Sequence, residues 1–273
     1  TAPTLAQVTA VTTPTNDNTS SYTFSSTEAG TISYSICGGN LDNASVDNNT
    51  IIFDALADDT YSDCKISVTD NASNTSDNLS VSSFTIDTTA PTASVTEATI
   101  TSSENAVIQS TETGTAYLVN TSVTVSNLAS INGADDNMSN SVAIDVANTD
   151  TDLPATGLAD GTYKVYAVDE TNNLSNASGN SVTLDTTAPT LSSVSIVSNN
   201  STSTLAAVGN VVTLSFIASE TISTPVVTFL SGGAAITDTS VTYVNTSGNT
   251  WTAVYTTESN DTTGSVAYSI AFS

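Results

Sequence analysis

The residues of this chain best suited to chemistry are its carboxylates and one pair of cysteines. The sequence has 27 aspartates and glutamates, only two lysines, and no histidine or arginine. Seven of the acids recur at corresponding points of a repeating pattern: Glu28, Glu112, Glu220, Asp70, Asp169, Asp87 and Asp185. Carboxylate oxygens are the ligands that Ca²⁺ prefers. These acids therefore make cation binding the first chemistry to consider.

The repeating pattern is marked by a hexapeptide. Asp87-Thr88-Thr89-Ala90-Pro91-Thr92 returns as residues 185–190, and the chain opens on its tail, residues 1–4. A period of about 90 to 100 residues indicates whole domains in tandem, because solenoid and propeller repeats are about 20 to 50 residues long. We expect three small domains, at residues 1–89, 90–187 and 188–273, each with a modest core.

Composition excludes several classes of function. The formal net charge of −25 repels nucleic-acid backbones and anionic lipid. No apolar run approaches the roughly 18 to 20 residues that span a bilayer, and no signal segment opens the chain. We expect no nucleic-acid partner and no membrane insertion in this segment, with any export signal or anchor lying outside it.

The elements that must position these acids are short strands. Runs of β-branched and aromatic residues are bounded by Asn, Asp, Gly and Ser, as in 50–53, 165–168, 181–184 and 211–216. The first repeat predicts seven strands, near residues 5–11, 22–25, 31–36, 44–46, 50–53, 61–69 and 81–86. Seven short strands suggest a Greek-key β-sandwich, with helix at most incidental. The second repeat matches the first at an acidic turn that leads into a tyrosine, Tyr61 or Tyr163, as in the tyrosine corner of immunoglobulin-like sandwiches.

The repeats resemble bacterial immunoglobulin-like (Big) domains of large surface proteins. The resemblance rests on the Asp-Thr-Thr-Ala-Pro-Thr linker, the Ser-Thr-Glu-(Ala/Thr)-Gly turn and the Asp-Asn-Ala-Ser-Asn hairpin. The first two repeats carry every motif, whereas the third has Val266 where the others have tyrosine. The resemblance implies an extracellular, stalk-like, non-catalytic array. We expect an elongated rod of three tandem sandwiches, because the linkers are short and contain proline.

The third repeat is expected to lack its last strand. Its predicted strands lie near residues 191–197, 211–217, 225–230, 240–244, 251–256 and 265–272, and no seventh follows. The last of them alternates apolar residues on one face: Val266, Tyr268, Ile270 and Phe272. An uncovered edge is prone to aggregation. We therefore predict that a strand completes this edge, from further along the same polypeptide, which we favour, or from a neighbouring copy.

Cys37 and Cys64 are predicted to form a disulfide. The first ends the third strand and the second begins the sixth, so both lie at the same end of neighbouring strands in one sheet. An even number of cysteines in an exported chain favours pairing. The alternative is two buried free thiols, and a zinc site lacks further ligands.

Strand directions predict where the repeated acids meet. Glu28, Glu112 and Glu220 follow second strands, and Asp70 and Asp169 end sixth strands, so each lies at the N-terminal end of its own domain. Asp87 and Asp185 finish seventh strands, next to the following domain. We expect Asp87 to meet Glu112 and Asp169, and Asp185 to meet Glu220, with Ca²⁺ shared at these interdomain junctions. The alternative is that these acids are turn residues that accept backbone N–H bonds. Asp58-Asp59 and Asp135-Asp136 are interpreted as solvated loop charges.

The sequence favours a structural role over an enzyme. It has no histidine, no arginine clamp and no nucleophile motif. The first hypothesis is a spacer stalk of an adhesin, joined to further immunoglobulin-like repeats. The second is a subunit of an extracellular filament or surface layer assembled through strand addition. A module that binds surface glycans is a third alternative, although Trp251 is expected to pack in the core.

Overall fold

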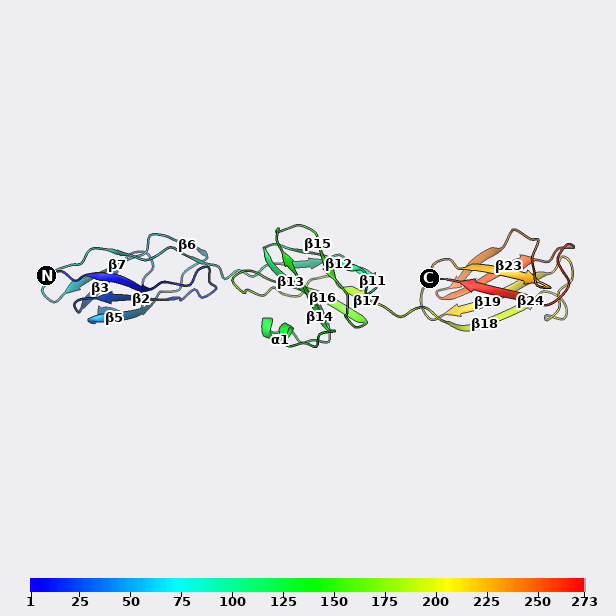
Figure 1. Cartoon of the computed structure of the whole chain (residues 1–273), viewed down its shortest axis with the longest axis horizontal. Coiled ribbons are helices and arrows are strands. Elements are labelled where there is room, and N and C mark those ends of the chain that lie inside the picture. Colours follow the sequence, from blue (N-terminus) through cyan, green and yellow to red (C-terminus); the bar gives the residue numbers. More distant parts are fainter. Residues whose placement is uncertain (273) are drawn as a thin grey trace. The chain divides into compact units, whose positions relative to one another are not determined.

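The chain is almost purely β in a computed structural model that describes residues 1–272 (Figure 1). One helix, α1 (Leu128–Asn132), is the exception in this range. No helix of the described residues is long and apolar enough to cross a membrane. The chain divides into two compact units, Thr1–Thr186 (unit 1) and Thr187–Ser273 (unit 2). Ser273, the last residue of the expected third repeat, lies outside the described residues. The prediction of an all-β fold is confirmed.

The first hydrophobic core of unit 1 lies between two sheets. One sheet has the order β1-β2-β5, the other β4-β3-β7-β8, and a short ladder joins β6 to β9. The strands are β1 (Leu5–Thr9), β2 (Ser21–Ser26), β3 (Gly30–Tyr34), β4 (Asn43–Ala44), β5 (Asp47–Ile52), β6 (Asp59–Tyr61), β7 (Lys65–Asp70), β8 (Leu79–Ser80) and β9 (Phe84–Ile86). In β2, Tyr22 and Phe24 point inward and are fully buried, whereas their neighbours are at least partly exposed. This alternation is what a strand with one face on a core requires.

The second core of unit 1 also lies between two sheets, and the chain crosses from one sheet to the other near the start of this core. Its sheets are β10-β12-β15 and β11-β17-β16-β13-β14. The strands are β10 (Ala93–Val95), β11 (Ala98–Ile100), β12 (Asn105–Ser110), β13 (Gly114–Asn120), β14 (Ser139–Ile144), β15 (Thr151–Pro154), β16 (Gly161–Val168) and β17 (Val182–Leu184). β10 and β11 follow each other in the chain but join opposite sheets, and β11 pairs in parallel with β17. β11 therefore covers the side of β17 that faces away from β16.

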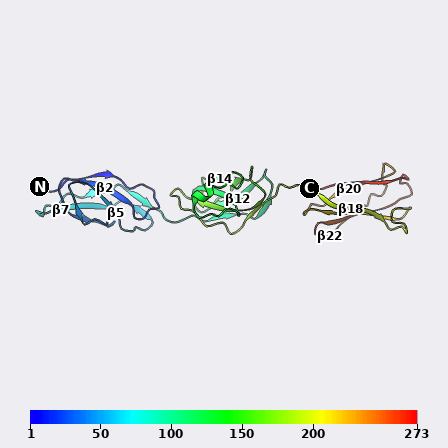
Figure 2. The same ribbon diagram turned by 90° about the horizontal axis from the view of Figure 1, so that it is seen from below.

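Unit 2 has a sandwich whose second sheet is smaller. Its sheets are β18-β19-β23-β22 and β21-β20-β24. The strands are β18 (Leu191–Ser198), β19 (Val211–Ala218), β20 (Val226–Ser231), β21 (Ala234–Ala235), β22 (Thr242–Ser247), β23 (Thr250–Thr256) and β24 (Val266–Ala271). Figure 2 shows the two layers from the side, with β20 in one and β18 and β22 in the other. Trp251 is 8 % exposed and belongs to the core, as expected.

The expected strands are present, but two strands of the first repeat differ in extent. The seventh, expected over residues 81–86, is strand only in β9, and the separate strand β8 before it pairs with β7. A single sixth strand was predicted over residues 61–69, whereas the structure has β6 and β7 separated by Ser62, Asp63 and Cys64. β6 pairs with β9, and β7 pairs with β3 and β8, so the two pieces have different partners. In the second core the corresponding strand, β16, is continuous.

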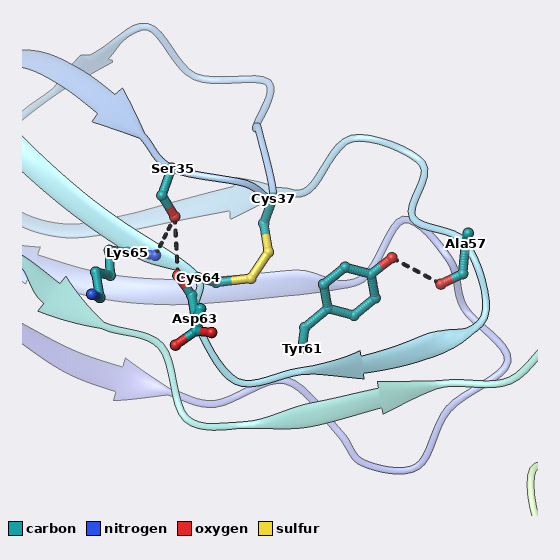
Figure 3. The surroundings of a disulfide bond; sticks show 7 residues. All are labelled: Ser35, Cys37, Ala57, Tyr61, Asp63, Cys64 and Lys65. Atoms are coloured by element: carbon teal, nitrogen blue, oxygen red, sulfur yellow. Dashed lines mark hydrogen bonds between the residues drawn. A yellow bond between two sulfur atoms is a disulfide. The ribbon is translucent and has the colours of Figure 1, made fainter.

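The predicted disulfide is confirmed. Cys37 follows β3 and Cys64 precedes β7, and the two are bonded with a Cα–Cα distance of 5.6 Å (Figure 3). Beside the bond, the Lys65 amide donates to Ser35 Oγ (2.8 Å). The antiparallel pairing of β3 with β7 brings the two cysteines to the same end of neighbouring strands.

Both tyrosine corners are also present in unit 1. Tyr61 donates its hydroxyl hydrogen to the Ala57 carbonyl at 3.0 Å, as Figure 3 shows. Tyr163 donates in the same way to the Ala159 carbonyl at 2.6 Å. The two hydroxyls thus fix the loops that precede β6 and β16.

Candidate metal centre

Three acidic residues from three segments of unit 1 meet between its two cores. Asp87 follows β9, Glu112 lies in the turn between β12 and β13, and Asp169 follows β16. One carboxylate oxygen from each lies within 4.8 Å of the others. Two ligands on opposite sides of one Ca²⁺ are about 4.8 Å apart, since each Ca–O bond is about 2.4 Å. One ion can therefore contact all three.

A glycine brings two of these acids together. A Cβ atom at Gly114 would collide with the Val168 carbonyl. Only a residue without a side chain allows β13 to begin this close to the end of β16. Because Glu112 precedes Gly114 by two residues and Asp169 follows Val168, the close approach sets the Glu112 turn beside Asp169.

Asp169 is fixed by the five-residue hairpin that it begins, residues 169–173 (the Asp169 hairpin). Its side chain is 7 % exposed. Oδ1 accepts hydrogen bonds from the Thr171 amide (2.8 Å), the Thr171 hydroxyl (2.8 Å) and the Asn173 amide (2.9 Å). Oδ2 accepts from Asn173 Nδ2 at 2.8 Å. Four donors thus satisfy the hydrogen-bonding capacity of this buried carboxylate.

The Asp169 hairpin also holds the segment that links the two cores, residues 87–92 (the linker). Asn173 Nδ2 lies 2.9 Å from the Asp87 carbonyl and 3.3 Å from the Thr89 carbonyl, so the amide hydrogen that does not face Asp169 is shared between these two acceptors. The Thr171 hydroxyl lies 3.3 Å from the Asp87 carbonyl. The second core therefore binds the linker through hydrogen bonds to its backbone.

Asp58 holds the same linker from the first core. Its Oδ1 accepts from the Thr88 amide (2.9 Å) and hydroxyl (2.7 Å), and its Oδ2 accepts from the Thr89 hydroxyl (2.6 Å). These bonds lower the pKa of Asp58, with the Thr89 hydroxyl as the largest cause. Asp58 is an exposed loop residue, as expected, but these bonds give it a contact with the linker that was not predicted. Asp160 makes the equivalent contact in the second repeat, where its Oδ1 accepts from the Thr186 amide at 2.9 Å. The recurrence of Leu-Ala-Asp before each tyrosine was therefore the sequence signal for this contact.

Glu112 is the electrostatically unfavourable member of the cluster. Burial raises the pKa of its carboxyl, and the charges of Asp87 and Asp169 raise the pKa further. Within residues 1–272 its carboxylate receives no hydrogen bond. A partly buried carboxylate beside two others is stabilised by a proton or by a shared cation.

The donor set suits a hard cation. It contains only oxygen, from three side chains, with the carbonyls of the linker nearby, which is the chemistry of Ca²⁺ and Mg²⁺ sites. Histidine is absent and both cysteines are bonded to each other. Soft metals that prefer nitrogen or sulfur are therefore poorly matched.

The remaining predicted ligands do not add to this cluster. Glu28 accepts a hydrogen bond from the Thr1 hydroxyl at 2.7 Å. Asp70 accepts from the Ala72 and Asn74 amides within its own hairpin, each at 2.8 Å. Among the residues described, neither joins a group of three potential ligands. Asp185 belongs to unit 1 and Glu220 to unit 2, so their expected meeting stays a prediction.

Comparisons with known proteins identify no family. The sequence matches none of the family models and none of the curated proteins with which it was compared. Among solved structures, a marsupial T cell receptor is similar at 12% identity and a TM-score of 0.38, over 97% of this chain and 98% of that one. The I9–I11 tandem from titin is similar at 10% identity and a TM-score of 0.29, over 98% and 94%. Similarities at these TM-scores identify neither a family nor a function.

Proposed function

We propose that the chain is a non-catalytic structural segment of an extracellular surface protein, acting as a spacer stalk of an adhesin of the bacterial immunoglobulin-like type. The observation that carries the proposal is the linker held from both sides, by Asp58 of the first core and by Asn173 of the second. A linker bound by both neighbours limits the angles between them. A spacer needs such a joint, because its reach depends on stiffness. The disulfide is in keeping with an oxidising, extracellular location.

The acidic cluster would make this joint responsive to calcium. Ca²⁺ shared by Asp87, Glu112 and Asp169 would remove their mutual repulsion and connect the linker to the second core. A ligand that binds only the docked arrangement stabilises it by mass action.

The joint is tested by two matched amide removals in the full chain. Asn173→Ala removes the donors to the linker carbonyls, whereas Asn74→Ala removes the corresponding residue of the first repeat, whose amide donates to Asp70 Oδ2. Distances between spin labels in the two cores of unit 1 should spread widely in Asn173→Ala and stay narrow in Asn74→Ala. Equal distributions in both variants would contradict a linker-based joint. Small-angle scattering separately tests the expected rod, which a compact particle would exclude.

Calcium is tested by calorimetry on the full chain. Ca²⁺ should bind, narrow the distance distribution and raise the melting temperature, and Asp87→Asn should abolish all three effects. If no heat of binding is found and chelation changes nothing, the three acids are turn residues only.

A filament or surface-layer subunit is the second candidate. It is favoured by the position of β24 at the outer edge of its sheet. Electron micrographs of chains joined end to end or packed laterally would support it over the spacer.

A further inference from the structure

The third sandwich is uncovered at one edge, as a comparison of β24 with β16 demonstrates. β16 has β13 on one side and β17 on the other, whereas the described part of the chain gives β24 only β20 as a neighbour. The inward residues Tyr163, Val165 and Ala167 of β16 are at most 1 % exposed. On β24, Tyr268 is 40 % exposed, and Val266 and Ile270 are only partly buried.

The two strands can be aligned residue by residue. Tyr163 lies opposite Asn120, the last residue of β13, and Val266 lies opposite Ser231, the last residue of β20. Two residues before each is a glycine with positive φ, Gly161 at 150° and Gly264 at 157°. Val266 therefore corresponds to Tyr163, as the sequence pattern predicted.

The alignment shows where a strand equivalent to β17 would lie in unit 2. β17 lies antiparallel to β16 with Val182 opposite Tyr163 and Leu184 opposite Gly161. Val182 and Leu184 are 1 % and 2 % exposed, so they fill the second core. Equivalent side chains in unit 2 would lie opposite Val266 and Gly264.

A cleft lies at the position where such a strand would pair with β24. It has a volume of about 760 Å³, and its lining includes Gly264, Val266 and, from the other sheet, Ile196 and Val212. Two apolar residues of the loop between β18 and β19 also line it, although Leu205 is 63 % and Val208 is 68 % exposed. Glu258 and Asp261 also line it, so the cleft joins an unpaired strand edge to a surface that is apolar in part and acidic in part.

β18 differs from its counterpart in a related way. In the second core the chain switches sheets, so that β11 pairs with β17. In unit 2, β18 stays with β19 along its whole length. The space between β18 and β24 is therefore unfilled by any strand of the described residues.

We propose that the free edge of β24 and this cleft bind an extended peptide strand with the chemistry of β17: antiparallel to β24, with branched apolar side chains at alternate positions inserted opposite Val266 and Gly264. Backbone hydrogen bonds to β24 supply affinity, and the apolar part of the cleft selects the side chains. Leu205 and Val208 cover the inserted residues from the loop side. This inference concerns unit 2 alone and is independent of the stalk function and of calcium.

The probe is a synthetic peptide of residues 179–189, which contains β17, added to the full chain. It should protect the amides of β24 from hydrogen exchange. The same peptide with Val182→Asp and Leu184→Asp should bind at least about tenfold more weakly, because the added charges would lie beside apolar side chains and be repelled by Glu258 and Asp261. Protection of unit 1 without protection of β24 would overturn the proposal.

Two surface variants locate the site. Val208→Asp should weaken binding about tenfold. Val244→Asp, on a 49 % exposed valine of β22, should leave binding unchanged; neither substitution disturbs a buried residue. Equal affinities of the two variants would place the peptide elsewhere. Concentration-dependent protection of β24 without peptide would show that a second copy covers this edge, and would also overturn the proposal.

Discussion

The Asp70 and Asp169 hairpins have the same local structure and different surroundings. Each begins with an aspartate whose Oδ1 accepts the amides of the residues two and four positions later. Each ends with an asparagine that donates to Oδ2 of that aspartate. In the first repeat the bonds stay within the hairpin, whereas in the second Asn173 also reaches the linker. In the second repeat, this self-supporting turn therefore also forms half of a joint.

The two hairpins differ at their three middle positions, and one of these accompanies the difference in bonding. Residue 72 is alanine and residue 171 is threonine, whose hydroxyl donates to Asp169 Oδ1 at 2.8 Å and lies 3.3 Å from the Asp87 carbonyl. The two repeats also differ in chemistry. The first has a disulfide, and the second contributes Glu112 and Asp169 to the acidic cluster. Four predictions test this contrast.

Removing the disulfide should have the largest effect and should be confined to the first core. Replacing both Cys37 and Cys64 with serine releases a loop with a sequence separation of 27. The free energy of unfolding of this core should fall by about 3–4 kcal/mol, because the unfolded chain gains entropy. Hydrogen exchange resolved by residue measures the change. Equal loss of protection in β16 and β7 would mean that the two cores unfold as one.

Asp169→Ala should cost about 2–3 kcal/mol, because it leaves two backbone amides of a buried turn without an acceptor. Chemical denaturation of the full chain measures the loss. Asp70→Ala is the matched control. It removes the same bonds from a more exposed turn and should destabilise less. A greater loss in the control would contradict the assigned role of burial.

Glu112→Gln should stabilise the calcium-free protein, by an amount on the order of 0.5 kcal/mol after solvent screening is allowed for. It removes one of three like charges whose repulsion raises the pKa of Glu112. The same change should eliminate stabilisation by Ca²⁺. Glu28→Gln, at the corresponding turn of the first repeat, should do neither. A stabilised control would show that net charge, not the cluster, is responsible.

The smallest effect is on the pH dependence of stability. The pKa of Glu112 is raised in the folded state, so the folded protein takes up this proton at a higher pH than the unfolded chain. Glu112 therefore contributes stability as the pH falls from above its raised pKa toward its ordinary value. Asp58 and Asp70, whose hydrogen bonds lower their pKa values, act in the opposite direction at lower pH. The difference between wild type and Glu112→Gln in calcium-free urea titrations isolates the Glu112 contribution, and a constant difference across pH would refute it.

The sequence predicted the features that depend on periodicity and on the chain direction of strands. The disulfide and the meeting of Asp87 with Glu112 and Asp169 both followed from which strand ends share one end of a sandwich. The division of β6 from β7 was not predictable, because it depends on a change of pairing partner that the apolar pattern of residues 61–69 does not record.

The hydrogen bonds across the linker left only one trace in the sequence, the recurrence of Leu-Ala-Asp before each tyrosine. In the sequence, Asp58 resembles an ordinary loop acid. It holds the linker only because the fold brings Thr88 and Thr89 within hydrogen-bonding distance of its carboxylate. Asn173 resembles Asn74 in sequence, and only the position of the neighbouring core distinguishes them. Contacts between domains carry no periodic signal.

The parallel pairing of β11 with β17 determines how the second core would respond to mechanical force. The chain enters this core through β10 and β11 and leaves it through β17. Tension applied at the two ends of this core would pull β11 and β17 in opposite directions along their length. The hydrogen bonds of their three paired positions would then bear the force together, rather than break one after another. In the first core, Thr15 does the same on a smaller scale, through bonds to Thr85 and Asp87. In unit 2, by contrast, β18 pairs with β19 along its whole length, and that pair is antiparallel.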